Sequence, residues 1–286
     1  MTLGSAAYRE LIYGGHLLAL GTASMAATAS LLLGNPPTLD LLVMAYLFSF
    51  GAYAVNRWSD FDEDAVSHPD RTSYLKARRG ALPWVAASAF GLGYAFAALR
   101  NPYFLGGLLA PLALAVTYSI GSDRLKRAVG VSRLKEGLVV KNLAISLGWS
   151  LVPVLVGLYY LKFPAPLLLL CPFIFMRLLV NTVFFDMRDV DGDLQYGVRT
   201  LPATIGPEKS RRVMAAVDVG AAAYVAALVG LGALPTFALP LAGLTVYSMA
   251  YRFYSGRTGR HADSIRDLVA DGEYLLWGVV TYIGFV

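Results

Sequence analysis

Long apolar stretches alternate with short polar segments along the whole chain. Runs without a charged residue extend over 11–39, 80–99, 101–122 and 142–161. Each is close to, or longer than, the roughly 20 residues that a helix needs to cross the hydrocarbon core of a bilayer. The pattern therefore predicts an all-α membrane protein with many spans.

Nine transmembrane helices are predicted from this pattern. Proline marks the short connections on one side, as at Pro36-Pro37 and Asn101-Pro102, because it cannot continue a helix. The connections on the other side are longer, polar and basic. The predicted spans are residues 10–33, 39–57, 81–99, 102–120, 137–160, 164–187, 210–232, 235–254 and 264–286.

Composition supports this class and orients the chain. Hydrophobic residues make up 57% and charged residues 15% of the 286 positions, and the mean hydropathy is +0.56. Of the 24 Lys and Arg residues, 21 fall at the N-terminus and in the long polar segments, whereas Arg100 and Lys162 fall on the opposite side. The positive-inside rule places the long segments in the cytoplasm. This topology accounts for the net charge of +5, so nucleic-acid binding is not expected.

A single transmembrane domain is expected over 1–286. Similar polar motifs end the second and sixth predicted spans, which suggests two four-helix units, 10–120 and 137–254, related as parallel repeats. The last helix, 264–286, would be an addition. The one cysteine, Cys171, lies in an apolar run, so a disulfide within the chain is impossible.

An acidic ladder lies where the second predicted span reaches the polar side. At 3.6 residues per turn, Asn56, Asp60 and Asp64 fall on one helix face, and Ser49 and Tyr53 extend this stripe inward. Aspartate is a poor residue for a helix interior. Carboxylates four residues apart on a helix also repel one another unless a cation lies between them. The spacing favours a binding site over a solvated helix end.

A second acidic ladder, Asp186, Asp189 and Asp193, ends the sixth predicted span. Because the chain crosses the membrane four times between the end of the second span and the end of the sixth, both ladders lie on one side of the membrane and can face one cavity. Hard divalent cations such as Mg²⁺ prefer carboxylate oxygens and commonly bridge them to a substrate phosphate. The two ladders therefore predict a shared Mg²⁺ site.

Basic and aromatic side chains lie between the ladders on the same side. Tyr118, Arg124 and Lys126 surround the end of the fourth predicted span, and Lys141 and Asn142 begin the fifth. Arginine and lysine are natural partners for diphosphate oxygens, above all in a partly dry cavity. The other basic residues of this segment are equally well explained as topology signals.

Several other ionisable residues have structural interpretations. Arg177 lies inside a span, opposite the face of Asp186, and is expected to form an interhelical bond. Asp263, Asp267 and Asp271 recur at the start of the last predicted helix. Acidic side chains stabilise a helix N-terminus, so helix capping and helix pairing are expected there.

Taken together, these motifs resemble those of the UbiA superfamily of intramembrane prenyltransferases. The resemblance covers the second to the seventh predicted helix and implies an all-helical ring around a central cavity, with the active site on the cytoplasmic side. Many members have Asn-Asp where this chain has Asn56-Arg57. The matching pieces, in order, are Asn56-x-x-x-Asp60-x-x-x-Asp64, Tyr118 to Lys126, Lys141-Asn142, and Asp186-x-x-Asp189-x-x-Gly192-Asp193 running into Gly197 to Pro202.

The resemblance implies Mg²⁺-dependent transfer of a polyprenyl group from an isoprenyl diphosphate to a small acceptor, with release of pyrophosphate. Two Mg²⁺ ions bridging the diphosphate would neutralise the leaving group, and a cavity within the membrane lipid would bury the prenyl tail. The expected metal ligands are Asn56, Asp60, Asp64, Asp186, Asp189 and Asp193. The expected catalytic residues are Asp60, Asp64, Asp189, Asp193, Tyr118 and Lys126, and the expected substrate-binding residues are Tyr53, Asn56, Arg57, Arg71, Arg124, Lys126, Lys141 and Asn142.

Acceptor identity is left open by these motifs. The segments Pro69-Asp70-Arg71 and Gly197 to Pro202 look most like prokaryotic members that act on aromatic rings or on geranylgeranylglyceryl phosphate, with a slight preference for aromatic quinone precursors. Two other classes remain as alternatives. One is a cation-coupled secondary transporter, whose carboxylates would lie near the midplane. The other is a CDP-alcohol phosphotransferase. The motif of that class is Asp-Gly-x-x-Ala-Arg, and this chain has Asp191-Gly192 but not the Ala-Arg that should follow it.

Overall fold

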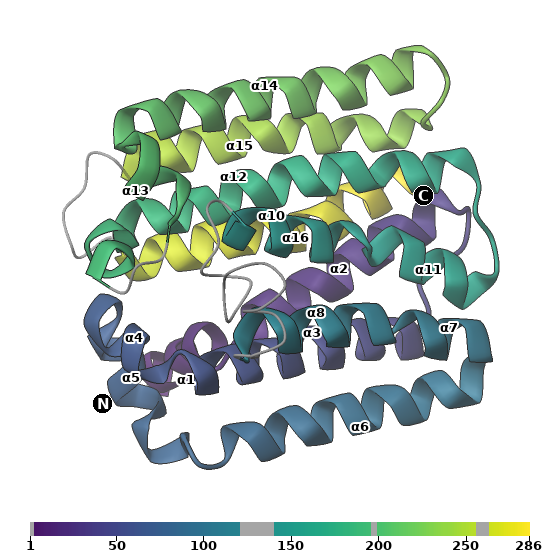
Figure 1. Ribbon diagram of the computed structural model, residues 1–286. Helices are drawn as coiled ribbons and strands as arrows, with labels where there is room; N and C mark the ends of the chain where they lie inside the picture. Colours follow the sequence, from purple (N-terminus) through teal and green to yellow (C-terminus); the bar gives the residue numbers. More distant parts are fainter. Residues whose placement is uncertain (1–2, 121–139, 196–198, 256–262) are drawn as a thin grey trace, which may run out of the picture.

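All regular structure is helical in the parts of the chain that the structure describes. These parts are residues 3–120, 140–195, 199–255 and 263–286 of a computed structural model (Figure 1). Helices are the expected form for apolar segments of this length, because backbone polar groups in lipid must bond within their own segment.

The long helices follow the predicted spans in order, and several spans are broken into two helices. In the first half of the chain the helices are α1 Leu3–Tyr13, α2 His16–Leu32, α3 Leu39–Ser59, α4 Phe61–Ser67, α5 Pro69–Leu75, η1 Lys76–Arg78, α6 Leu82–Arg100, α7 Pro102–Gly107 and α8 Leu109–Ser119. In the second half they are α10 Val140–Ser150, α11 Val152–Tyr160, α12 Ala165–Gln195, α13 Leu201–Ile205, α14 Pro207–Gly230, η3 Thr236–Ala238, α15 Leu239–Ser255 and α16 Asp263–Phe285.

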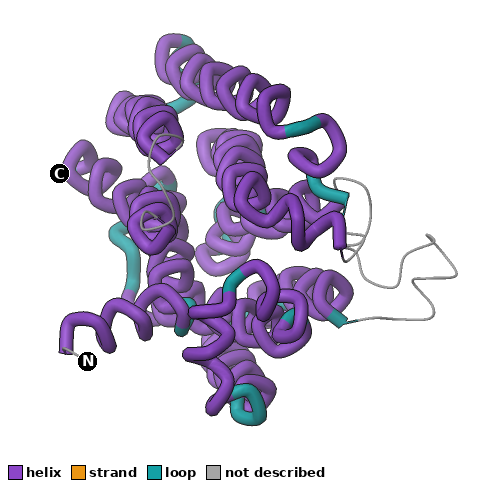
Figure 2. Tube along the Cα trace, turned by 90° about the vertical axis from the view of Figure 1, so that its left-hand side faces the viewer, coloured by secondary structure: helices purple, strands orange, loops and turns teal. Residues whose placement is uncertain are grey.

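The long helices are arranged in a ring around the centre of the molecule (Figure 2). Around this ring α2 packs on α3, α3 on α8, α8 on α10, and α10 on α12. Ion pairs join α12 to α16, and α16 packs on α2, which closes the ring. Helix α6 packs against α3, and α14 and α15 pack outside α12 and α16 (Figure 1). This order places α16 across the ring from α8.

Six helices of the described part are long and apolar enough to cross a membrane, and the bent pair α1 and α2 adds a seventh if it counts as one span. The predicted number of nine spans is therefore not confirmed. Helix α15 has only 17 residues. Polar residues near the start of α16, among them Asp271 and Glu273, lower the hydropathy of that helix.

The first span bends by 58° between α1 and α2. Gly15 lies at the bend with a φ of 86°, in the left-handed region that favours glycine. A Cβ atom on Gly15 would also lie 2.3 Å from a ring carbon of Tyr53 on α3. The bend brings Ile12 and Tyr13 of α1 to the central cavity.

A buried ion-pair network joins α12, α14, α15 and α16. Arg177 on α12 donates hydrogen bonds to Asp218 on α14, and to both carboxylate oxygens of Glu273 on α16 at 2.6 and 2.8 Å. Arg252 on α15 donates to the other oxygen of Asp218. Because water cannot hydrate these groups, two cations and two carboxylates must compensate one another. The predicted interhelical bond of Arg177 is confirmed.

Replacing Arg177 with methionine is expected to lower the free energy of unfolding by about 3–5 kcal/mol, because Glu273 would stay buried without its main partner. Thermal unfolding of the detergent-solubilised protein measures this loss. Arg212→Met is the control, since this side chain on α14 is 78% exposed and should contribute less than about 0.5 kcal/mol. Equal unfolding midpoints for the two variants would contradict a stabilising role of the network.

Candidate active site

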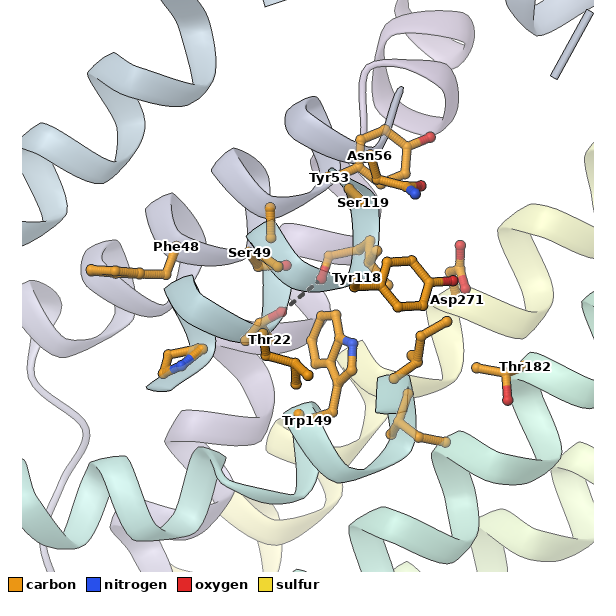
Figure 3. Close-up of a pocket in the computed structure, with 18 of the residues that line it drawn as sticks. Thr22, Phe48, Ser49, Tyr53, Asn56, Tyr118, Ser119, Trp149, Thr182 and Asp271 are labelled. Atoms are coloured by element: carbon orange, nitrogen blue, oxygen red, sulfur yellow. Dashed lines mark hydrogen bonds between the residues drawn. The ribbon is translucent and has the colours of Figure 1, made fainter. Parts of the chain in front are cut away.

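A cavity of about 440 Å³ lies inside the ring of helices (Figure 3). Its walls in the middle of the bundle are apolar and include Phe48, Phe90, Phe104 and Val156. Its other end lies where α4 and α5 cross the ends of the long helices, and we call this the polar end. Of the residues predicted as site residues, those that line the cavity are Tyr53, Asn56, Arg57, Asp60, Asp64, Arg71, Tyr118, Lys141, Asp186, Asp189 and Asp193.

The first acidic ladder spans the junction of α3 and α4. The expected single helix is interrupted here, because α3 ends at Ser59 and α4 begins at Phe61. Backbone hydrogen bonds from Asp60 N to Asn56 O at 2.9 Å and from Asp64 N to Asp60 O at 2.8 Å preserve the helical spacing. The Asn56 amide donates to the Asp60 carboxylate at 2.6 Å. The ladder therefore keeps one face toward the cavity in spite of the break.

Two guanidinium groups hold the Asp64 carboxylate. Arg57 donates to one oxygen at 2.7 Å and Arg71, from α5, to the other at 2.8 Å. Burial alone would raise the pKa of Asp64, but the charges of Arg57 and Arg71 lower it below its usual value. The Arg57 guanidinium also lies 4.4 Å from the centre of the Tyr53 ring, within cation–π distance. Asp64 is thus ionised and bound to two cations.

The second acidic ladder lies on the last turns of α12. Asp186, 2% exposed, is contacted by the Lys141 ammonium at 2.7 Å and accepts a hydrogen bond from the Asn142 amide at 2.6 Å. Lys141 also lies 3.6 Å from Asp193. Asn142 is fully buried and does not line the cavity, and its contact orients Asp186 from behind the cavity wall.

Neutral partners hold the other two carboxylates of this ladder. The His68 Nε2 lies 3.2 and 3.3 Å from the two oxygens of Asp189. Burial and the nearby Arg71 charge lower the pKa of His68, so the neutral imidazole donates this hydrogen bond at neutral pH. Thr200 donates to Asp193 at 2.9 Å. Burial raises the pKa of Asp193 to about 6, although the Lys141 charge opposes this rise.

Only part of the segment between the ladders belongs to the residues that the structure describes. Tyr118, near the end of α8, points into the cavity (Figure 3). Arg124 and Lys126, predicted to bind substrate, lie outside the described residues.

Four acidic or basic residues that were not assigned to the site also line the cavity: His68, Arg188, Asp267 and Asp271. Asp267 joins α16 to α12, because Arg188 on α12 donates a hydrogen bond to it at 2.9 Å. The sequence predicted a helix-pairing role of this kind. The location of Asp267 on the cavity wall was not predicted. The four-residue spacing of Asp267 and Asp271 was visible in the sequence, but it could not show which way that face of α16 turns.

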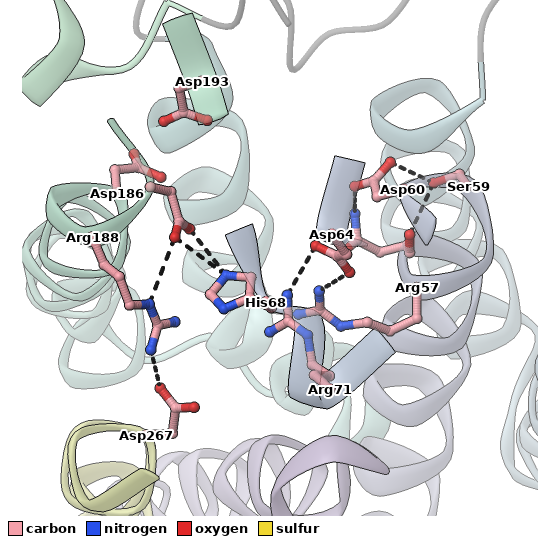
Figure 4. A network of polar contacts seen from close by, with 12 residues as sticks. Arg57, Ser59, Asp60, Asp64, His68, Arg71, Asp186, Arg188, Asp193 and Asp267 are labelled. Atoms are coloured by element: carbon pink, nitrogen blue, oxygen red, sulfur yellow. Dashed lines mark hydrogen bonds and ion pairs between the residues drawn. The ribbon is translucent and has the colours of Figure 1, made fainter. Parts of the chain in front are cut away.

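The oxygen donors of the two ladders face each other from opposite sides of the polar end, with His68 between them (Figure 4). Among the described residues, no group of three or more His, Cys, Asp or Glu side chains is arranged to hold a metal ion. Carboxylate and amide oxygens are nevertheless the donors that Mg²⁺ prefers. The arrangement suits a cation whose coordination is completed by the oxygens of a ligand in the cavity.

A model of the UbiA prenyltransferase family matches residues 17–269. The chain belongs to this family. This UbiA protein is therefore an integral membrane prenyltransferase, and the transporter and phosphotransferase alternatives are set aside.

Curated relatives of this UbiA protein are archaeal enzymes. It is 27% identical over 212 residues to the digeranylgeranylglyceryl phosphate synthase of Methanoculleus marisnigri, a match that covers 73% of this chain and 67% of that one. It is 31% identical over 189 residues to the enzyme of the same name from Methanothrix thermoacetophila, covering 65% of each chain.

Solved structures share the fold. A UbiA homolog from Aeropyrum pernix superposes with a TM-score of 0.65 at 20% identity, covering 94% of this chain and 96% of that one. A UbiA homolog from Archaeoglobus fulgidus, bound to GPP and Mg²⁺, superposes with a TM-score of 0.65 at 14% identity, covering 96% and 97%. At these identities the likeness shows the fold alone.

The protonation of His68 can be tested directly. In the protein without added Mg²⁺, the His68 imidazole should titrate below the ordinary histidine pKa of about 6.5, because burial and Arg71 disfavour its charged form. Nuclear magnetic resonance of histidine-labelled protein measures the midpoint, and loss of one signal in His68→Gln assigns it. A midpoint above 6.5 would show that Asp189 holds a charged imidazole instead.

Proposed function

We propose that this prenyltransferase transfers a polyprenyl group from an isoprenyl diphosphate to a glycerol phosphate acceptor, in a Mg²⁺-dependent reaction at the polar end of the cavity. The observation that carries this proposal is the pair of acidic ladders facing each other, with basic side chains among them, at the end of an apolar cavity. The basic loops of the chain support a cytoplasmic location of the polar end.

The apolar part of the cavity suits a prenyl tail. Its phenylalanine and aliphatic side chains offer burial to a hydrocarbon, which is favourable by roughly 0.8 kcal/mol per methylene group. A carbocation-like centre at the head of this tail must be kept from water until the acceptor reacts. The enclosing helices exclude water there, and the faces of Tyr53 and Tyr118 on the cavity wall can stabilise positive charge.

The polar end suits a diphosphate. Arg57, Arg71 and Lys141 line the cavity and bond to carboxylates. Diphosphate oxygens would take over these cations, because charge-assisted bonds to phosphate are strong in a partly dry site. The released oxygens of Asp60, Asp64, Asp186, Asp189 and Asp193, with Asn56, would hold Mg²⁺, which neutralises the leaving group when bound.

The names of the relatives support a glycerol phosphate acceptor. Eight curated relatives that match this chain are digeranylgeranylglyceryl phosphate synthases, and this name describes a product with two geranylgeranyl groups on glyceryl phosphate. The slight preference for aromatic quinone precursors that the sequence suggested has no support among them. We therefore favour geranylgeranylglyceryl phosphate as the acceptor and geranylgeranyl diphosphate as the donor.

Single amide substitutions test the metal assignment. Asp60→Asn and Asp189→Asn should each lower Mg²⁺-dependent product formation by about 100-fold or more, because an electrostatic contribution to the transition state is lost. Asp62→Asn is the matched control, since this carboxylate lies on α4 between Asp60 and Asp64 but is 81% exposed and pairs with Arg79. Full activity of folded Asp60→Asn and Asp189→Asn proteins would show that the metal assignment is wrong.

A panel of acceptors tests the substrate. Purified protein in lipid nanodiscs receives geranylgeranyl diphosphate, Mg²⁺ and either geranylgeranylglyceryl phosphate or an aromatic acid, and the products are identified by mass spectrometry. Pyrophosphate release and an ether product with the glycerol phosphate acceptor alone are expected. A prenylated ring with the aromatic acid alone would overturn the proposed acceptor, although it would leave prenyl transfer intact.

A further inference from the structure

One carboxylate on the cavity wall lies outside the two ladders. Asp271 on α16 is partly buried, lines the cavity and points into it (Figure 3). The carboxylates of Asp64 and Asp186 each contact a cationic side chain at 2.7 Å, and that of Asp189 lies 3.2 Å from the His68 imidazole. Among the described residues, Asp271 forms no ion pair of this kind. Its carboxylate is therefore not bound to a fixed cationic side chain.

The surroundings of Asp271 point to a ligand in the cavity. Asn181 on α12 lies beside it and also lines the cavity, at 6% exposure. The Asn181 amide is the hydrogen-bond partner of the Asp271 carboxylate, but the geometry of this contact is poor, so the buried amide nitrogen is incompletely satisfied. A ligand oxygen held between Asn181 and Asp271 would satisfy both groups.

Asp271 and Tyr118 lie on opposite sides of the ring of helices. Tyr118 is on α8 and Lys141 on the neighbouring α10, whereas α16 lies across the ring from α8. The ring of Tyr118 points from its helix toward the side where Asp271 lies (Figure 3). A molecule that enters along the α16 wall therefore meets the head of the prenyl group from the side opposite Tyr118.

We propose that Asp271 is a catalytic residue that binds the hydroxyl of the acceptor, together with Asn181, and accepts its proton. This inference rests on the proposed function, because it requires a hydroxyl acceptor. In the reaction, the hydroxyl oxygen forms a bond to C1 of the prenyl group. The bond from C1 to the diphosphate oxygen breaks, and its electron pair leaves with pyrophosphate. The hydroxyl proton passes to the Asp271 carboxylate.

Neighbouring residues support this role for Asp271. Asp267, one turn earlier on α16, is engaged by Arg188 at 2.9 Å and is not available as a proton acceptor. Glu273, two residues later, is fully buried in the ion-pair network with Arg177. That network fixes α16 against α12, which keeps Asp271 beside Asn181.

The test compares hydroxyl and thiol acceptors. In Asp271→Asn, ether formation from geranylgeranyl diphosphate and geranylgeranylglyceryl phosphate should fall by about 100-fold or more, the usual effect of removing a general base. The KM for the diphosphate should change little. An acceptor analogue with a thiol in place of the hydroxyl ionises without help, so the same variant should lose only about 10-fold or less with it. Asp271→Glu should recover part of the ether formation.

Controls separate the possible failures. Asp62→Asn, exposed on α4, should behave as the unmodified protein with both acceptors. The same pair of acceptors is measured in Asp271→Ser, which keeps the test valid where asparagine prevents folding. Equal losses with hydroxyl and thiol acceptors, or ether formation within threefold of the unmodified protein, would overturn the role of Asp271. Absence of any ether product in the unmodified protein would instead overturn the proposed acceptor.

Discussion

Compensation of charge inside an apolar bundle is the constraint on which this structure depends. A charged side chain away from water is costly unless an opposite charge or several hydrogen bonds accompany it. The protein meets this demand twice. In the outer layer, Arg177 and Arg252 balance Asp218 and Glu273. At the polar end, arginine, lysine, histidine and amide groups hold the carboxylates of both ladders.

The ion pairs of the outer network and those of the polar end differ in whether a ligand can reach them. The outer network is closed, because Arg177, Asp218 and Glu273 are at most 1% exposed and do not line the central cavity. It fixes the helices that surround the site. The partners at the polar end line a cavity, so a ligand with enough negative charge can replace carboxylates as the partner of the cations. A rigid support and an exchangeable set of ion pairs are thus built from the same residue types.

Helix α16 connects the two. Glu273 ties it into the closed network, while Asp267 and Asp271, on the preceding turns, reach the cavity. Its contacts with α2 and α12 complete the ring, so the last helix is a structural part of the site. The short helices α4 and α5 do the same on the other side, because they carry His68 and Arg71 over the ends of the long helices.

The sequence by itself determined the helical class, the order of the spans and the two acidic ladders, because these depend on periodicity within a single segment. It also determined that the ladders share one membrane side, and their motifs indicated the family. Only the tertiary structure decided that Asn142 stands behind Asp186, that His68 meets Asp189, and that Asp271 faces the cavity. These outcomes join residues far apart in the chain, and many acidic and basic side chains were equally plausible partners. Packing of the helices, which no local pattern encodes, selected among them.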